Sequence, residues 1–198
     1  MTLSAKKVLY TIGHSSHEQE HFLDLLKTHS ISAVCDVRSI PYSRRNPQFN
    51  KDALTAALKS SGIAYVFLGK ELGAKDPDRD CCIDGKVQFN LIAATSEFQA
   101  GLDRVLTGIE QYKVALLCAE EDPFICHRTI LVTRHLRQQT ESILHIRGDS
   151  RIETNEQFEQ HLLEVAGVDK DDLFDSEASA IDRAYNVQGQ RISYEFPE

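Results

Sequence analysis

The sequence has no apolar run long enough to cross a membrane, no Cys-x-x-Cys pair and no excess of positive charge. A membrane-spanning helix needs about 20 consecutive apolar residues, and no segment of this 198-residue chain approaches that length. The apolar stretch near the N-terminus is too short for a signal peptide. We therefore expect a cytoplasmic protein with no membrane partner.

Charge and cysteine content exclude two further classes of protein. The net charge is −8, and affinity for duplex DNA comes mainly from neutralising phosphates, so nonspecific binding of duplex DNA is not expected. The five cysteines are an odd number, and two of them, Cys35 and Cys118, fall within expected buried strands. This pattern does not fit a secreted protein held together by disulfides.

Short apolar runs alternate with amphipathic segments along most of the chain. The expected strands are residues 8–14, 31–38, 63–68, 114–119 and 142–146. The expected helices are residues 16–28, 51–60, 89–109, a segment from 122 or 126 to about 137, and 154–167. This alternation predicts a three-layer α/β fold, with a mostly parallel five-stranded sheet between helices, of the Rossmann-like kind.

Two segments fall outside this alternation. Residues 69–86 show no periodicity, and they are either a lid over a site or a surface loop with no role. From residue 168 the chain turns acidic, so we expect an α/β domain at residues 1–167. Residues 168–198 would then be an extension packed on or near this domain, with a helical pattern at 178–185 and a strand pattern at 191–196.

Reactive side chains follow three of the five expected strands. His14 and Ser15 lie at the end of the first strand, Asp36 and Arg38 end the second, and Glu120 follows the fourth. Ligands of open α/β sheets bind at the carboxyl ends of the strands. The Rossmann-type order 3-2-1-4-5 makes these three strands neighbours, whereas the flavodoxin-type order 2-1-3-4-5 separates them. We therefore predict the order 3-2-1-4-5.

The candidate catalytic residues are two carboxylates, an imidazole and a thiol: Glu120, Asp36, His127 and Cys126. Partial burial at a strand end raises a carboxyl pKa, which suits Glu120 for acid–base chemistry; an internal ion pair with Arg38 or Arg128 is the alternative. Asp36 has the same alternative, a pair with Arg38. Cys126 lies near a helix start beside basic residues, which lowers a thiol pKa, but a cysteine that only packs is the alternative.

The candidate anion-binding residues are basic or hydroxyl side chains near the same strand ends: His14, Ser15, Arg38, Ser43, Arg44 and Arg128. Arginine is suited to bidentate contact with phosphate or carboxylate, and scattered surface charges are the alternative. No metal site is predicted, because the histidine and cysteine spacing matches no zinc signature. The first strand ends in GHSSHE rather than G-x-G-x-x-G, which argues against NAD or FAD, and no cofactor is assigned.

Taken together, three motifs resemble the bacterial and archaeal family catalogued as domain of unknown function 488. They are Thr11-Ile12-Gly13-His14-Ser15, Asp36-Val37-Arg38, and Leu117-Cys118-Ala119-Glu120 followed by Cys126-His127-Arg128. The resemblance covers nearly the whole chain, with one departure at Ala74, where the family often has a second glycine after Leu72-Gly73. It implies an α/β fold and a shared pocket lined by these motifs, but no particular reaction.

Three functions remain open at this point. The first is an enzyme acting on a phosphate-bearing substrate, either a nucleotide or a nucleic-acid end. The second is a binding or regulatory module for a small anionic ligand, and the third is a cysteine-based redox protein with a low-pKa thiol at Cys126. A carboxylate such as Glu120 in the pocket favours the enzyme, because a pure anion binder has little need of negative charge there.

Overall fold

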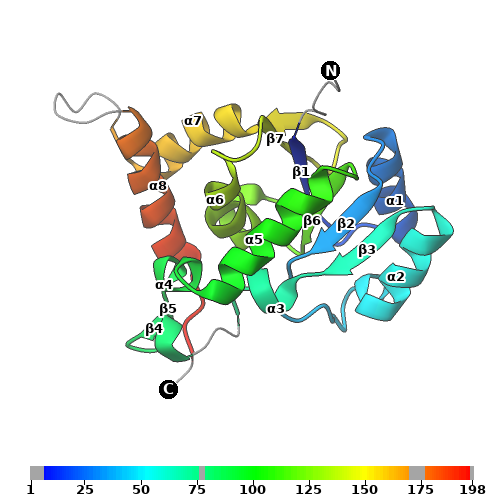
Figure 1. Ribbon diagram of the computed structural model, residues 1–198, viewed down its shortest axis with the longest axis horizontal. Helices are drawn as coiled ribbons and strands as arrows, with labels where there is room; N and C mark the ends of the chain where they lie inside the picture. The colour runs from blue at the N-terminus through cyan, green and yellow to red at the C-terminus, as the bar shows by residue number, and fades with distance from the viewer. Residues whose placement is uncertain (1–6, 76–78, 170–176, 197–198) are drawn as a thin grey trace.

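The computed structural model describes residues 7–75, 79–169 and 177–196. A central sheet lies between helices that cover both of its faces (Figure 1). Its strands are β1 (Val8–Gly13), β2 (Ala33–Asp36), β3 (Ala64–Phe67), β6 (Val114–Cys118), β7 (Ser142–Ile146) and β8 (Ile152–Thr154). The pairs among the first five of these are parallel, and β8 runs antiparallel to β7. The expected α/β class with a mostly parallel sheet is therefore confirmed.

The predicted strand count and strand order are both wrong. The sheet has six strands in the order β3-β2-β6-β1-β7-β8, so the fourth parallel strand along the chain separates the first from the second. The wholly apolar β6 is buried at every position and lies inside the sheet. On β1, the buried Thr11 hydroxyl bonds His145 of β7 at 2.9 Å. The observed and predicted orders both keep β1, β2 and β6 together, so reactive strand ends could not distinguish them.

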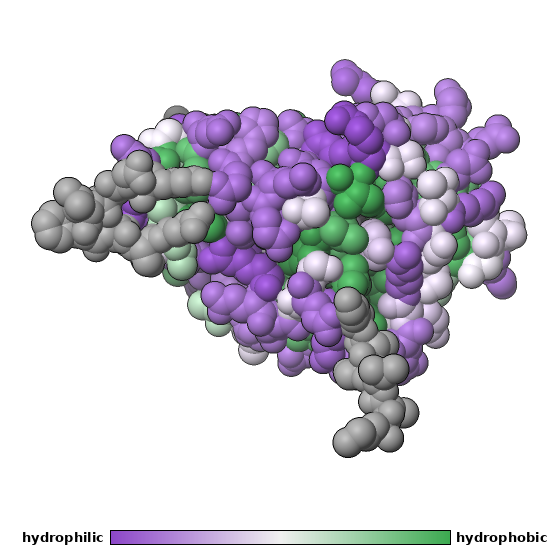
Figure 2. All heavy atoms as spheres, turned by 90° about the horizontal axis from the view of Figure 1, so that it is seen from above, coloured by the Kyte–Doolittle hydropathy of each residue, from purple (hydrophilic) through white to green (hydrophobic). Residues whose placement is uncertain are grey.

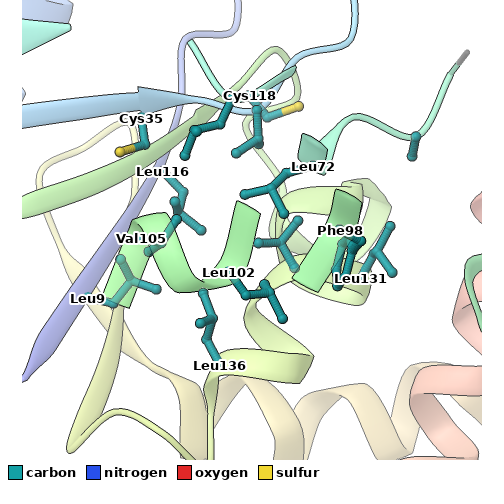
Figure 3. Close-up of a cluster of buried hydrophobic side chains, with 14 of the residues drawn as sticks. Leu9, Cys35, Leu72, Phe98, Leu102, Val105, Leu116, Cys118, Leu131 and Leu136 are labelled. Carbon is teal, nitrogen blue, oxygen red and sulfur yellow. The ribbon is translucent and has the colours of Figure 1, made fainter. Parts of the chain in front are cut away.

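Alternation along the strands divides the core into two layers. On one face, α1 (Gln19–Thr28) and α2 (Lys51–Ser60) pack on residues such as Ile12 and Leu117. On the other face, α5 (Ser96–Ile109) packs on Leu9, Cys35 and Leu116. Figure 3 shows this second layer, with Val105 of α5 near Leu9 and Leu116 of the strands and Phe98 of α5 beside Leu131. A π-helical segment, Arg128–Thr133, and α6 (Arg134–Leu136) complete this face.

The stretch expected to lack structure contains short elements. Within residues 69–87 lie α3 (Gly69–Leu72), a 3-10 turn (Arg79–Cys81), and a small hairpin of β4 (Cys82–Ile83) and β5 (Lys86–Val87); residues 76–78 lie outside the described part. The expected helix 89–109 is two helices, α4 (Phe89–Ala93) and α5. Thr95 separates them, because its hydroxyl accepts a hydrogen bond from the Phe98 N–H and so caps α5.

The C-terminal part contains one helix pair. The expected helix at 154–167 is α7 (Asn155–Ala166), which a capping box between Thr154 and Gln157 begins and Gly167, with a φ of 70°, ends. α8 (Glu177–Ile192) packs against α7 and is longer than the expected helix at 178–185. The expected strand at 191–196 is reduced to an isolated bridge between Lys86 and Glu195. The most acidic stretch, at 170–176, lies outside the described residues.

The start of α1 also differs from expectation. Ser15 and Ser16 have the spacing of a capping box, yet α1 begins only at Gln19 and has no side-chain cap. Ser15 instead adopts a φ of 49° in the turn after β1. Within the described part of the chain, no helix has the length and apolarity needed to span a bilayer. Polar side chains cover most of the face seen in Figure 2.

Candidate functional site

The carboxyl ends of β2, β6 and β1 lie side by side and form one edge of the sheet. Backbone hydrogen bonds continue the pairing past the strands, from His14 N–H to Cys118 C=O (3.0 Å) and from Val37 N–H to Leu117 C=O (3.1 Å). A cavity of about 250 Å³ lies at this edge, and we call it the β2–β6 cavity. It is lined by Arg38, Ser39, Ile40, Tyr42, Lys75, Cys118, Ala119, Glu120 and His127.

A thiol, a carboxylate and an imidazole line this cavity at Cys118, Glu120 and His127. The buried thiol of Cys126 lies against Glu120, and we call these four residues the thiol cluster. Glu120 Oε2 accepts hydrogen bonds from the thiols of Cys118 (3.0 Å) and Cys126 (3.4 Å). His127 Nε2–H donates to the Val37 carbonyl at 2.9 Å, so in the neutral ring Nδ1 is the nitrogen that carries the lone pair. That Nδ1 lies 3.6 Å from Cys118 Sγ. Three of the four candidate catalytic residues thus lie together.

The pKa values in the thiol cluster differ from those expected. Burial raises the pKa of the Glu120 carboxyl, but hydrogen bonds from Cys118, from its own backbone and from Cys126, together with the charge of His127, lower it below its ordinary value. The prediction of a raised pKa is therefore wrong. Burial raises the pKa of the Cys126 thiol well above its ordinary value, so the low pKa expected at Cys126 is wrong as well. The expectation came from the position of Cys126 near a helix start, and the sequence does not show that its thiol is fully buried.

Asp36 is fully buried and holds Arg38 rather than facing the cavity. Its carboxylate accepts from Arg38 Nε (2.9 Å) and Nη2 (2.6 Å), and from the Tyr65 hydroxyl (2.8 Å). Arg38 Nη2 also donates to the Phe49 carbonyl at 3.0 Å. The ion pair foreseen as an alternative is thus present, and it fixes the direction of the guanidinium.

His14 supports the same guanidinium from the other side. Its Nδ1–H donates to the Ser15 carbonyl at 2.7 Å, so Nε2 is free to accept from Arg38 Nη1 at 3.1 Å. The ring stacks on Phe49 with centroids 4.4 Å apart. Burial, with the positive charge of Arg38 beside the ring, lowers the pKa of His14 to about 4. His14 is therefore neutral near pH 7, and it positions Arg38.

Arg128 is buried and its guanidinium binds backbone rather than facing the cavity. Its Nη1 donates to the Glu120 carbonyl, and its Nη2 donates to the Glu121 carbonyl at 2.7 Å. An ion pair of Glu120 with Arg38 or Arg128 was the alternative to an acid–base role. Arg128 binds the main chain of Glu120 and not its carboxylate, and no such pair is found among the described residues. Arg128 thus fastens the loop that follows β6.

The other predicted anion-binding residues lie away from the cavity wall. The Ser43 hydroxyl accepts from the Asn46 N–H at 3.1 Å and stabilises a turn. Arg44 is exposed, and Ser15 lies in the turn after β1. Among the six predicted anion-binding residues, all within the described part of the chain, only Arg38 lines the cavity.

Cys118 and Lys75 are among the cavity residues that the sequence did not mark as site residues. Cys118 was taken as a core residue, although it lies two positions before Glu120, and alternate positions along a strand share a face. Lys75 lies in the stretch without periodicity, where no pattern marks it. The spacing-based expectation of no metal site also missed a grouping in space. The ligand atoms of Cys118, Cys126 and His127 lie within 4.8 Å of one another.

Comparison with known proteins gives one match. A family model described as Domain of unknown function DUF488 matches residues 18–135, which include Arg38 and the whole thiol cluster. No curated protein and no solved structure matches the chain.

Proposed function

Because the chain belongs to the DUF488 family, whose description assigns no reaction, we propose a function from the site itself. The proposal is an enzyme that acts on a small phosphate-bearing substrate, a nucleotide or a nucleic-acid end, at the β2–β6 cavity. The observation that carries it is the thiol cluster, in which reactive groups of three kinds meet on the wall of one cavity. Convergent polar groups in a concave site are the usual mark of an active site.

The lining of the cavity also carries positive charge, at Arg38 and Lys75. Arg38 has five N–H donors, and its contacts with Asp36, His14 and Phe49 occupy four of them. One N–H of Nη1 therefore remains for a ligand, and the exposed Lys75 adds a second cation. A volume of about 250 Å³ is below the ~300–1,000 Å³ of drug-sized pockets. A cavity of this size suits the phosphate group of a substrate whose other parts lie outside the cavity.

The thiol cluster supplies the chemistry in this proposal. A phosphate held by Arg38 and Lys75 lies beside the Glu120 carboxylate, which accepts the proton of an attacking hydroxyl or water as its oxygen bonds to phosphorus. The bond from phosphorus to the leaving oxygen breaks, and that oxygen takes up a proton from water. The fixed charge of Arg38 stabilises negative charge that develops on the phosphate oxygens. Asp36 is a positioning residue in this scheme, because it acts through Arg38.

The non-catalytic alternative is a module that binds a small anion, and Arg38 and Lys75 support it equally. Glu120 distinguishes the two functions, because a carboxylate on the cavity wall repels an anion unless it takes part in chemistry. The redox alternative is weakened by the raised pKa of the Cys126 thiol, since the thiolate is the reactive form.

The test combines binding with turnover. Inorganic phosphate, mononucleotides, and short oligonucleotides with and without a 5′-phosphate are screened by thermal shift and then for conversion. We expect a phosphorylated ligand to raise the melting temperature, and Lys75→Ala to weaken its binding several-fold. Lys70→Ala, at an exposed lysine outside the cavity lining, is the matched control and should change nothing.

Glu120→Gln separates the two functions. In an enzyme it keeps the ligand and loses most of the turnover, whereas in a binding module there is no turnover to lose. If no phosphorylated compound binds, or if Glu120→Gln leaves conversion unchanged, the proposed reaction is wrong.

A further inference from the structure

We infer that Cys118, Cys126 and His127 form a binding site for one divalent transition-metal ion, and that zinc fits these donors best. The ion would lie at the wall of the β2–β6 cavity. This inference goes beyond the proposed function, because metal binding can be measured without any substrate. It rests on the mutual distances of the donor atoms, on the orientation of His127 and on the position of Glu120.

The donor distances suit a tetrahedral ion. Zinc lies about 2.3 Å from sulfur and about 2.0–2.1 Å from nitrogen, which places a sulfur and a nitrogen ligand about 3.6 Å apart in a tetrahedron. Cys118 Sγ and His127 Nδ1 are 3.6 Å apart. The donor atoms of Cys118, Cys126 and His127 all lie within 4.8 Å of one another, so small side-chain rotations bring all three onto one ion.

His127 is oriented as a metal ligand requires. Its Nε2–H donates to the Val37 carbonyl at 2.9 Å, so the lone pair of Nδ1 points toward Cys118. Histidines that bind metals usually donate their other ring N–H to a carbonyl or carboxylate in this way. Val37 directly follows β2, so the neighbouring strand fixes the ring.

The fourth coordination position faces the cavity. Glu120 Oε2 lies 3.0 Å from one sulfur and 3.4 Å from the other, and it can be the fourth ligand or bind a water in that position. Cys118, Glu120 and His127 all line the cavity. Three protein donors with a fourth position open to a cavity are the arrangement of catalytic rather than structural zinc.

The loop that carries the site is held without help from a metal. Arg128 binds the carbonyls of Glu120 and Glu121, and Asp122 caps the 3-10 turn at Pro123–Ile125 by accepting from the Phe124 N–H. These contacts bring Cys126 back to the end of β6. The π-helical turn that begins at Arg128 is a feature often found at functional sites.

The chemistry of binding is a displacement of protons. Two thiols lose their protons and bind the ion as thiolates, so one divalent ion releases two protons and the charge of the two thiolates balances that of the ion. Two sulfur donors and one imidazole favour zinc over calcium, magnesium or manganese.

The test uses the full chain and cobalt(II) as a spectroscopic probe. The metal content of the purified protein is measured, the metal is removed with a chelator, and cobalt(II) is added in steps. We expect one equivalent to bind, with the intense sulfur-to-cobalt charge-transfer absorption of two thiolates, two protons released, and displacement by zinc. The absence of this absorption would overturn the inference.

Variants locate the ion. Cys118→Ser and Cys126→Ser should each reduce the charge-transfer absorption by about half and weaken binding at least tenfold, and His127→Asn should weaken binding similarly. Cys35→Ser is the matched control, because Cys35 is buried in the neighbouring β2 but lies outside the thiol cluster. Absorption that persists unchanged in both cluster variants overturns the site. Circular dichroism checks each fold, and if Cys126→Ser does not fold, Cys118→Ser and His127→Asn decide.

Discussion

Arg128 is a buried arginine with a structural task. Its guanidinium bonds the carbonyls of Glu120 and Glu121, and hydrogen bonds that involve a charged group contribute about 1.5–3 kcal/mol each. We predict that Arg128→Ala lowers the free energy of unfolding by about 3 kcal/mol, as measured by urea denaturation. Arg44→Ala, at an exposed arginine, should change it by less than about 0.5 kcal/mol.

Arg44 and Arg128 show why the roles of single arginines could not be predicted from the sequence. Both were predicted to bind an anion, because both lie near expected strand ends. The acceptors of Arg128 are backbone carbonyls, which every residue has, so no residue type in the sequence marks them. Equal stability of Arg128→Ala and the wild type would restore the anion-binding role.

His145 on β7 is buried as a neutral imidazole. Its Nε2–H donates to Asn155 Oδ1 at 3.3 Å, and its Nδ1 accepts from the Thr11 hydroxyl at 2.9 Å. Asn155 Nδ2 donates to Glu159 at 2.8 Å, which assigns the amide oxygen to His145. Burial, with the charges of Arg128 and Arg147 nearby, lowers the pKa of His145 to about 3.

This low pKa makes stability depend on pH. The unfolded chain takes up the proton near pH 6.5, whereas the folded chain does so only near pH 3. The contribution of neutral His145 is therefore complete above pH 6.5 and is lost as the pH falls toward 3, by about 1.4 kcal/mol per pH unit. We predict that the free energy of unfolding, measured with urea, falls more between about pH 7 and about pH 5 in the wild type than in His145→Gln. Equal losses would contradict this assignment.

At the scale of elements, β1 and the loop after β6 approach so closely that only glycine fits between them. Gly13 pairs with Cys118, and a Cβ at Gly13 would lie 1.9 Å from the Glu120 carbonyl oxygen. We predict that Gly13→Ala destabilises the fold by about 3 kcal/mol and displaces Glu120, so that the cobalt absorption is lost as well.

Gly108→Ala in α5 is the matched control. A Cβ there meets only Val114 Cγ2, at 3.7 Å, which is an ordinary contact. Alanine favours a helix interior over glycine by about 0.5–1 kcal/mol, so this variant should be more stable than the wild type in the same denaturation assay. If Gly13→Ala is tolerated as well as Gly108→Ala, the close approach is not a constraint.

An element could be predicted when the residues that determine it lie close together in the sequence. The capping box of α7 involves residues three apart, and the five parallel strands follow from apolar runs, so both could be read from the sequence. The break at Thr95 and the hairpin β4–β5 depend on contacts with other elements. The order of β1 and β6 depends on which strands pair, and both arrangements bring the same reactive ends together.

At the scale of the whole molecule, α8 connects the C-terminal part to the candidate site. Tyr185 is fully buried among residues such as Phe124 and Phe158, and its hydroxyl donates to Glu159 at 3.1 Å. Gln188 Nε2 donates to the Phe124 carbonyl at 2.7 Å. Phe124 lies between Glu120 and Cys126, so α8 supports the loop that carries the thiol cluster.

The division into a domain at 1–167 and an extension at 168–198 stays a prediction, and truncation tests it. A chain that ends at residue 169 loses Tyr185 and the buried Ala180 and Ala184 and so exposes the side chains that they cover, such as Phe124 and Phe158. Each large apolar side chain exposed to water costs about 1.5–3 kcal/mol. We predict a loss of at least about 3 kcal/mol in unfolding free energy, together with weaker cobalt binding.

Gln188→Ala separates these two effects within the full chain. It removes one hydrogen bond to the loop and leaves the aromatic cluster in place, so it should lower the unfolding free energy by about 1 kcal/mol and still weaken cobalt binding measurably. Tyr194→Ala, at a side chain that is 40% exposed, should change neither quantity. If the truncated chain unfolds at the wild-type midpoint and binds cobalt equally well, α8 is independent of the site, because the Phe124 contact then has no effect on Glu120 and Cys126.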